Sequence, residues 1–413
     1  MTRLNLDFVR SQFPPMRDAE TRGWAFFENA GGSCAPDQVV DKLDHFFRRT
    51  KVQPYYPYGP SEQAGEAMDR SQELWARCLN VEPEEIQLGP STTINEYVLA
   101  QALRAEMQAG DRVIVTEQDH EANIGAWARL ADTGIDVRYW TVDPESGLLD
   151  VAALQSLLNE RTRLVCFTHC SNVCATINPV REITELCHQA GARVVVDGVS
   201  YAPHAALDLR ALGVDFYLFS LYKTYGPHIG LMYVRRDHLE HIQNQGHFFN
   251  AASLTKRLTP AGPDHGEIAC ASGVIDYFQV LYDHHQPDAP ADSVADMAQQ
   301  VFQWVGQHEQ QLMEPLLDFL GGRSSVRVLG HPRPDRDIRV PTIAFTSERA
   351  DNQAIAAAMA DRQVGVGFGH FYAYRLMEAV GIDPASGVTR LSLVHYNTPE
   401  EVERAIQVLD PLV

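Results

Sequence analysis

One lysine attracts attention because of its position after an apolar run. Residues 216–220, "FYLFS", have the composition of a buried strand, and Lys223 follows three residues later, just ahead of a Gly226-Pro227 turn. A lysine that follows a buried strand is either a solvated loop residue or a reactive amine. The neighbouring segments of the chain must distinguish between these two interpretations.

A carboxylate follows the preceding apolar strand. Asp197 comes directly after "RVVV", where an unpaired charge would be costly to bury. One short helical stretch and one strand separate it from Lys223, so both are expected at the same edge of a parallel sheet. Two interpretations stay open here. The residues form a direct ion pair, or they hold pyridoxal phosphate, with a Schiff base to the lysine and the carboxylate on the ring nitrogen.

Hydroxyl side chains could supply the phosphate site that this cofactor requires. Ser91, Thr92 and Thr93 stand at the start of an apolar-periodic helix within residues 88–103. Backbone N–H groups and the helix dipole make such a position an anion site, although an ordinary N-cap is the alternative. Ser220 and Tyr222, close to the lysine, could add further hydroxyl donors.

Two loop residues could contact the cofactor ring. His120 lies between a predicted strand and a predicted helix, where its imidazole could stack on the ring or simply face solvent. Asn172 follows the next predicted strand, and its amide could reach the ring hydroxyl.

Strands and helices alternate through the middle of the chain. This order predicts an α/β fold with a largely parallel sheet covered on both faces, and the strands are expected at 112–116, 137–142, 163–169, 193–198, 215–220 and 230–235. After residue 284 a long amphipathic helix, short strands and two more helices indicate a smaller α+β domain. We therefore predict an N-terminal segment (1–20), a large domain (21–284) and a small C-terminal domain (285–413).

The composition narrows the classes of partner. A net charge of −20 argues against binding to nucleic acid or to an anionic membrane surface, but not against a small anionic ligand. The first 30 residues lack a signal-peptide core and no apolar run is long enough to span a bilayer, which predicts a cytoplasmic protein. The seven cysteines include no C-x-x-C pair, so no metal site is expected.

The segments that carry these residues resemble a known family. "VDGVSYAPHAALDLRALGVDFYLFSLYKTYGPHIG" (196–230) is similar to the class V, fold-type I pyridoxal phosphate enzymes, most closely the Suf-type cysteine desulfurases and selenocysteine lyases. The resemblance extends in order along the chain, through "FFENAGGS" (26–33), "HEANIGAW" (120–127), "HCSNVCATINPV" (169–180) and "VTRLSLVHYNTPEEV" (388–402). It implies a fold-type I, aminotransferase-like large domain and a homodimer.

The resemblance also implies a role for each matching residue. Lys223 would carry the Schiff base and move protons, Asp197 would pair with the ring nitrogen, and Arg390 would hold the substrate α-carboxylate. Ser200 and Tyr222 occupy positions where the family has glutamine and histidine. The other implied cofactor contacts are His120, Asn172, Ser91, Thr92 and Ser220, and the implied substrate contacts are Asn29 and Ala30.

One departure from the family bears directly on the reaction. Where Suf-type desulfurases have R-x-G-x-x-C, this chain has "GFGHFY", so that Gly367 replaces the arginine and Tyr372 replaces the sulfur-accepting cysteine. A phenol cannot form a persulfide. Either Cys174 or Cys34 substitutes, or the protein forms no persulfide, and we favour the second interpretation.

These observations predict a pyridoxal phosphate-dependent enzyme that binds an α-amino acid as an external aldimine. A cysteine desulfurase-like C–S (β-) lyase without a persulfide cysteine is the favoured reaction, and Tyr372 could serve it as an acid or orienting group. A class V aminotransferase and an amino-acid epimerase are the alternatives. A cofactor-binding protein without turnover is less consistent with the intact set of Lys223, Asp197 and Arg390.

Overall fold

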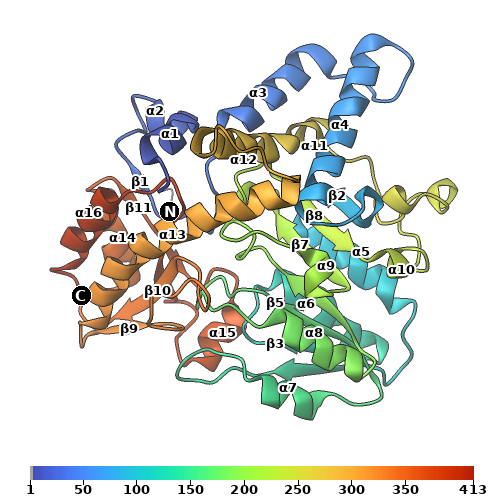
Figure 1. The fold of residues 1–413 in the computed structure, drawn as a ribbon. Helices are drawn as coiled ribbons and strands as arrows, with labels where there is room; N and C mark the ends of the chain where they lie inside the picture. Colours follow the sequence, from blue (N-terminus) through green and yellow to red (C-terminus); the bar gives the residue numbers. More distant parts are fainter. Residues whose placement is uncertain (1–2) are drawn as a thin grey trace.

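A seven-stranded sheet forms the centre of the larger part of the molecule (Figure 1). The computed structural model describes residues 3–413. Along the sheet the strands follow the order β2 (Ile86–Gly89), β8 (Gly230–Val234), β7 (Phe216–Ser220), β6 (Arg193–Asp197), β5 (Thr162–Thr168), β3 (Arg112–Thr116) and β4 (Asp136–Trp140). β8 alone runs in the direction opposite to the other strands of the sheet. The predicted, mainly parallel sheet is confirmed, whereas β2 and the reversed direction of β8 were not predicted.

The strands of this sheet are apolar because both faces are buried. In β7, Phe216 and Leu218 pack into one apolar cluster, while Tyr217 and Phe219 pack into the cluster on the opposite face. One face is covered by α5 (Thr92–Arg104), α6 (Ala122–Ala128) and α10 (Arg236–Leu239). The other contacts α4 (Gly59–Cys78), α7 (Val151–Leu157), α8 (Val180–Gln189), α9 (Leu209–Leu212) and α12 (Ser272–His285).

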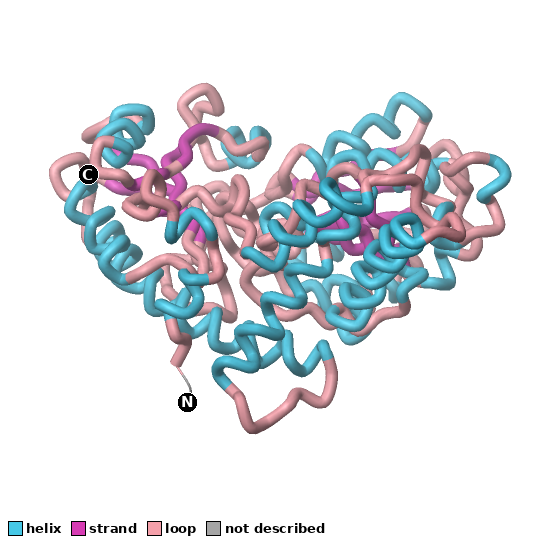
Figure 2. Tube along the Cα trace, turned by 90° about the horizontal axis from the view of Figure 1, so that it is seen from above, coloured by secondary structure: helices cyan, strands magenta, loops and turns pink. Residues whose placement is uncertain are grey.

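The smaller part contains a four-stranded antiparallel sheet. Its strands follow the order β12 (Gly367–Gly369), β13 (Val388–Ser392), β10 (Thr342–Ser347) and β9 (Val326–Val328). Its helices are α14 (Asn352–Ala360), α15 (Tyr374–Ala379) and α16 (Pro399–Leu409). Figure 2 shows the strands of the two sheets as separate groups joined by helices and loops. This arrangement confirms the predicted α+β character of the C-terminal region.

The 28-residue helix α13 (Val294–Gly321) links the two parts. It packs against α4 and α12 in the larger part, and against α16 and β9 in the smaller one. Its buried face includes Val301 and Trp304 near one end and Leu316 and Leu320 near the other. One amphipathic helix therefore contributes to both cores.

The N-terminal region crosses between the two parts. The helices α1 (Leu6–Ser11) and α2 (Pro14–Arg17) lead to β1 (Ala25–Phe26), which pairs in parallel with β11 (Val364–Gly365) of the C-terminal region. Residues 25–26 are thus bonded to the smaller part, although the large domain was predicted to begin at residue 21. The predicted domain boundaries remain a prediction.

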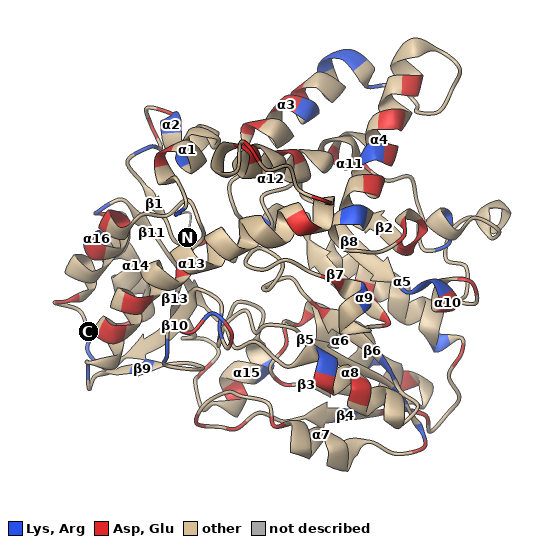
Figure 3. Cartoon of the chain, viewed as in Figure 1, with Lys and Arg blue, Asp and Glu red and all other residues tan. Residues whose placement is uncertain are grey.

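Charged residues lie mostly outside the central strands (Figure 3). Strands β2, β7 and β8 contain none, while acidic and basic residues are interspersed over the helices and loops. Within residues 3–413 no helix combines the length and the apolar character needed to cross a membrane. The cytoplasmic location remains a prediction.

A close approach of two helices gives a test of the packing. On α12, a Cβ added at Gly273 would lie 2.5 Å from the Gln38 carbonyl oxygen and 2.7 Å from the Val39 Cα of α3 (Asp37–His45). Both atoms belong to the backbone and cannot rotate away. Gly273→Ala is expected to destabilise the protein by about 1–3 kcal/mol, measured by denaturant unfolding.

Gly321→Ala is the matched control, because a Cβ at Gly321 would meet no atom within 4 Å. It should leave the free energy of unfolding unchanged or raise it slightly, since alanine is the better helix former. Equal stability of the two variants would contradict the close packing of α3 on α12.

Candidate active site

A cavity of about 190 Å³ opens at the carboxyl ends of the central strands. It is formed by the start of α5 and by the segments that follow β3, β5, β6 and β7. All nine residues that the sequence assigns to the cofactor line it: Ser91, Thr92, His120, Asn172, Asp197, Ser200, Ser220, Tyr222 and Lys223. The lining also includes Thr168 and His228, which the sequence reasoning did not select.

Lys223 is held by a tight turn directly after β7. It ends a one-turn 3-10 helix whose first residue, Leu221, is fully buried. The Leu221 N–H donates to the Ile229 carbonyl (2.9 Å), and the Gly226 N–H donates to the Leu221 carbonyl (2.8 Å). Burial and the charge of Arg390 lower the pKa of Lys223 to about 8. A free amine is therefore far more abundant here near neutral pH than on a solvated lysine.

Asp197 ends β6 as a buried carboxylate. Only 4% of the residue is exposed, and its Oδ1 accepts a hydrogen bond from the Val199 N–H at 2.8 Å. Burial raises the pKa of Asp197 to about 6, against the opposing effects of that N–H and of the Lys223 charge. The ionised form would be stabilised by one more donor or cation placed in the cavity.

Hydroxyl groups gather where α5 begins. Ser91 is the N-cap, and its hydroxyl accepts a hydrogen bond from the Ile94 N–H. The Thr92 Oγ1 and the Ser220 Oγ lie 2.7 Å apart, so the start of α5 and the end of β7 meet at one wall of the cavity. Together with the positive end of a 13-residue helix, these groups suit an anion.

His120 forms part of the cavity wall as a neutral imidazole. Burial, helped by the charges of Lys223 and Arg390, lowers its pKa to about 3. Its Nδ1 lies 3.0 Å from the Ala122 N–H, which donates to it, so the remaining proton belongs on Nε2. A neutral ring next to two cations can stack on a planar ligand without adding a third positive charge.

The loop before α15 packs beside the cavity. The Asn172 Nδ2 donates to the Phe371 carbonyl and the Glu121 N–H donates to the Tyr372 carbonyl, both at 2.8 Å. Phe371 and Tyr372 have φ angles of 49° and 58°, which are uncommon for such side chains. The Tyr372 ring centroid lies 5.2 Å from that of His120, but 68% of Tyr372 is exposed and it does not line the cavity.

Arg390 approaches the site from β13 of the smaller part. Only 2% of it is exposed. Its Nη1 donates to the Asn172 carbonyl at 3.0 Å, its Nη2 forms an ion pair with the Glu28 Oε1, and the Phe371 ring covers its guanidinium with 3.7 Å between the carbon and the ring centroid. Arg390 lies outside the cavity lining, yet its charge affects the pKa of Lys223. The sequence reasoning missed Glu28 and Phe371, although Glu28 immediately precedes the selected Asn29.

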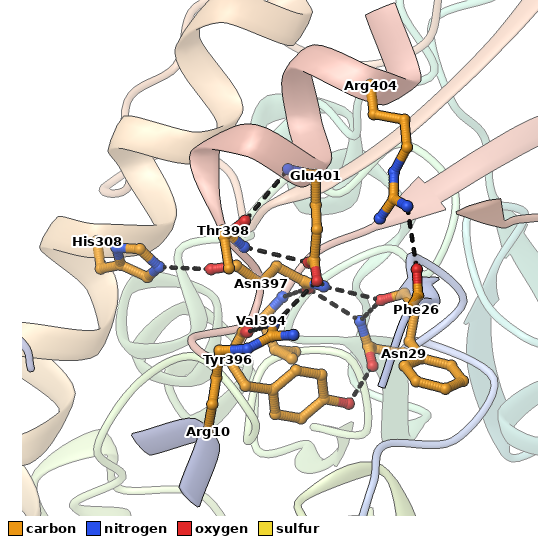
Figure 4. Close-up of polar contacts among 11 residues, drawn as sticks. Arg10, Phe26, Asn29, His308, Val394, Tyr396, Asn397, Thr398, Glu401 and Arg404 are labelled. Carbon is orange, nitrogen blue, oxygen red and sulfur yellow. Dashed lines mark hydrogen bonds and ion pairs between the residues drawn. The ribbon is translucent and has the colours of Figure 1, made fainter. Parts of the chain in front are cut away.

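Asn29 and Ala30 form hydrogen bonds between the N-terminal region and the smaller part. The Asn29 Nδ2 donates to the Phe26 carbonyl at 2.7 Å, and its Oδ1 accepts from the Tyr396 hydroxyl (Figure 4). The Asn29 Nδ2 also donates to the Ser392 carbonyl at 2.8 Å. The Ala30 N–H donates to the Ser392 Oγ at 2.8 Å. Neither residue lines the cavity, and their predicted contact with substrate remains a prediction.

The two cysteines proposed as substitute nucleophiles do not face this cavity. Cys174 is fully buried in an apolar cluster, and burial raises the pKa of its thiol to about 12. Burial also raises the pKa of Cys34, which is partly exposed. Among residues 3–413 no cysteine lines the cavity. Neither thiol has the lowered pKa of a reactive cysteine.

Comparison with known proteins identifies the family. The model of the aminotransferase class-V family matches residues 25–267 and 291–405. The chain belongs to this family. Its relatives include the aminotransferase-like protein FGM3 of Gibberella zeae, 36% identical with 98% of each chain covered, and a cysteine desulfurase of Salmonella gallinarum, 30% identical with 96% of each covered.

The fold is also that of solved structures. The apo structure of a cysteine desulfurase from Thermococcus onnurineus superposes with a TM-score of 0.85 over 100% of this chain and 99% of the other, at 23% identity. This similarity confirms the predicted fold-type I architecture. Family membership establishes the protein as an enzyme that depends on pyridoxal phosphate.

The environment of Lys223 predicts an unusual reactivity. In protein stripped of cofactor, acylation of Lys223 by an amine-specific reagent should rise with pH around a midpoint near 8, because burial and Arg390 disfavour the ammonium form. Arg390→Gln removes a nearby positive charge and should move this midpoint upward. Peptide mass spectrometry gives the extent of labelling, with exposed Lys51 as the internal reference for the reagent. A midpoint that is the same with and without Arg390 would refute the electrostatic coupling of the two residues.

Proposed function

We propose that this enzyme is a β-lyase that cleaves the C–S bond of a sulfur-containing α-amino acid without forming a persulfide on a cysteine. This proposal rests on the identity of one residue beside the cavity, Tyr372. Tyr372 stands on the loop where the desulfurase-type pattern places its cysteine, and no cysteine among residues 3–413 lines the cavity. The retained charged residues support chemistry at the α-carbon, and the proposed replacement of the cysteine by Tyr372 would remove the usual acceptor of sulfur.

The side chains of the cavity fit pyridoxal phosphate. Asp197, buried and bonded to a single N–H, is suited to a protonated ring nitrogen, and its ionised form would gain the donor that it lacks. The hydroxyls of Ser91, Thr92 and Ser220 at the positive end of α5 suit the phosphate. Asn172, whose buried Oδ1 has no hydrogen-bond partner, would lie near the ring oxygen.

Ser200, Tyr222 and His120 complete the proposed cofactor site. Ser200 and Tyr222 bring hydroxyls to the same cavity, and the Tyr222 ring stacks on His228 with 4.4 Å between centroids. His120 would cover one face of the cofactor ring as a neutral imidazole. The proposed site thus has a negative residue at one end and neutral donors at the other.

Lys223 is the proposed base. When bound, the cofactor supplies a carbonyl group that condenses with amines and a ring that accepts the electrons released at the α-carbon. The Lys223 amine, with its pKa lowered to about 8, is suited to hold the cofactor and then to remove the α-proton of a bound amino acid. Arg390 would hold the α-carboxylate in the plane of its guanidinium, and so fix which α-bond faces the lysine.

Loss of the α-proton prepares the bond to sulfur for cleavage. The sulfur leaves with the bonding electron pair and takes up a proton, and hydrolysis of the remaining fragment gives a keto acid and ammonia. Tyr372 is the proposed acid or orienting group for this step, since it lies beside His120 at the edge of the site. For cysteine the products would be sulfide, pyruvate and ammonia.

A panel of reactions separates this proposal from its alternatives. With cysteine and related β-substituted amino acids we expect release of sulfide or thiol together with a keto acid. Lys223→Ala should abolish this turnover and the visible absorbance of the bound cofactor, while Lys51→Ala should change neither. Amino transfer that depends on an added keto acid would indicate an aminotransferase. Exchange of the α-proton with solvent deuterium without elimination would indicate an epimerase.

Cysteine variants test the absence of a persulfide. Cys174→Ala and Cys34→Ala are expected to keep kcat within about threefold of the parent enzyme, because neither thiol faces the cavity. The rate of keto acid release is the measurement, with thermal unfolding as a check on the fold. A loss of about a hundredfold or more in a folded variant would point to a persulfide on that cysteine and would contradict the proposal.

A further inference from the structure

The ion pair between Glu28 and Arg390 brings an acidic side chain into contact with the proposed carboxylate-binding arginine. The Glu28 Oε1 contacts the Arg390 Nη2, although 362 residues separate the two in sequence. The two side chains differ in exposure, with 3% of the arginine side chain and 35% of the glutamate side chain accessible. The guanidinium is therefore fixed in the interior, while the carboxylate has a route to solvent.

Two glycines provide the space in which the Glu28 carboxylate lies. A Cβ at Gly31 would come within 1.8 Å of its Oε2, and a Cβ at Gly367 within 2.7 Å of its Oε1. Gly367 pairs directly with Arg390 across the β12–β13 ladder. A Cβ at Gly31 would require this carboxylate to shift, and a Cβ at Gly367 would require either the carboxylate or the Phe371 ring to shift.

The glutamate occupies the part of Arg390 that a carboxylate ligand needs. Phe371 stacks on a face of the guanidinium, which leaves the in-plane edges for hydrogen bonding. Nη1 already donates to the Asn172 carbonyl and Nη2 contacts Glu28, while the buried Nε has no partner. A carboxylate that takes the Nη2 N–H facing Glu28 has to displace this glutamate.

We infer that Glu28 is a specificity-determining residue whose carboxylate occupies Arg390 in the free enzyme and is displaced by the substrate α-carboxylate. The inference rests on the proposed role of Arg390. Displacement moves Glu28 toward solvent, along the side that is already exposed, and leaves its negative charge close to the bound substrate. The site therefore favours amino acids with a single carboxylate, because a second one would be repelled by Glu28.

Binding of simple carboxylates to the holoenzyme tests this inference. Propionate is the one-carboxylate probe and succinate the two-carboxylate probe, and titration calorimetry gives their dissociation constants. Glu28→Gln should bind propionate about tenfold more tightly, since it removes one charged competitor for the arginine. The gain for succinate should be larger, since the repulsion disappears as well.

Three further variants make the result specific. Glu182→Gln, an exposed acid on α8, should match the parent enzyme. Glu28→Asp shortens the side chain, weakens its contact with Arg390 and should also tighten propionate binding. In an Arg390→Gln background, replacing Glu28 should no longer tighten it. The last result attributes the effect of Glu28 to the arginine.

Unchanged or weaker propionate binding by folded Glu28→Gln and Glu28→Asp would overturn the inference, because Glu28 would then serve only to position Arg390. An equal gain for propionate and succinate would remove the claim of selectivity between them. Neither measurement involves bond cleavage. A negative result in these binding measurements therefore does not contradict the proposed lyase reaction. A negative result in the panel of reactions does not contradict the proposed competition between Glu28 and a carboxylate ligand for Arg390.

Discussion

The burial of charge beside an apolar sheet is the constraint on which the rest of the site depends. Asp197 and Arg390 are almost inaccessible to solvent, and Lys223 lines the same cavity as Asp197. Burial alone would drive each of these groups toward its neutral form. The pKa of Lys223 falls to about 8 and that of Asp197 rises to about 6, so each moves toward the pH at which it can exchange a proton. Such opposed shifts in one cavity are characteristic of catalytic sites.

The same charges lie where the two parts of the chain meet. Arg390 belongs to a strand of the smaller part, whereas Lys223 and Asp197 belong to the larger one. The segment around Glu28 lies between them, held by the Asn29 contacts to Ser392 and by the pairing of β1 with β11. A shift of this segment would alter the position of Glu28 on Arg390. The hydrogen bonds of Asn29 therefore help to position Glu28 beside Arg390.

Much of the large domain could be predicted from sequence because its determinants are local. Short apolar runs alternate with helical stretches, and in parallel sheets the residues after each strand meet at one edge. These two rules were enough to bring Lys223, Asp197, His120 and Asn172 together. The direction of β8 and the existence of β2 were missed, since a four-residue strand at the edge of the sheet gives little periodic signal.

The contacts of Arg390 could not be predicted from these two rules. Its partners Glu28 and Asn172 lie 362 and 218 residues away in sequence. The local sequence pattern around each of these residues gives no information about the other two. Phe371, which covers the guanidinium, has a positive φ that nothing in its sequence neighbourhood requires. Contacts between residues of the larger and the smaller part depend on how the hydrophobic cores of the two parts pack against each other.

Similarity of fold cannot choose among the reactions open to this scaffold. A cysteine desulfurase with 23% identity superposes along the whole chain, yet such a likeness speaks for architecture alone. The reaction depends on which groups reach the bond that breaks. Beside this cavity the chain presents an aromatic loop held by the Asn172 amide and the Glu121 N–H, and a glutamate on the arginine that would bind substrate. A thiol nucleophile needs a lowered pKa and access to substrate, and Cys174 has neither. These local groups, rather than the shared fold, are the basis of the reaction and the substrate preference that we propose for this enzyme.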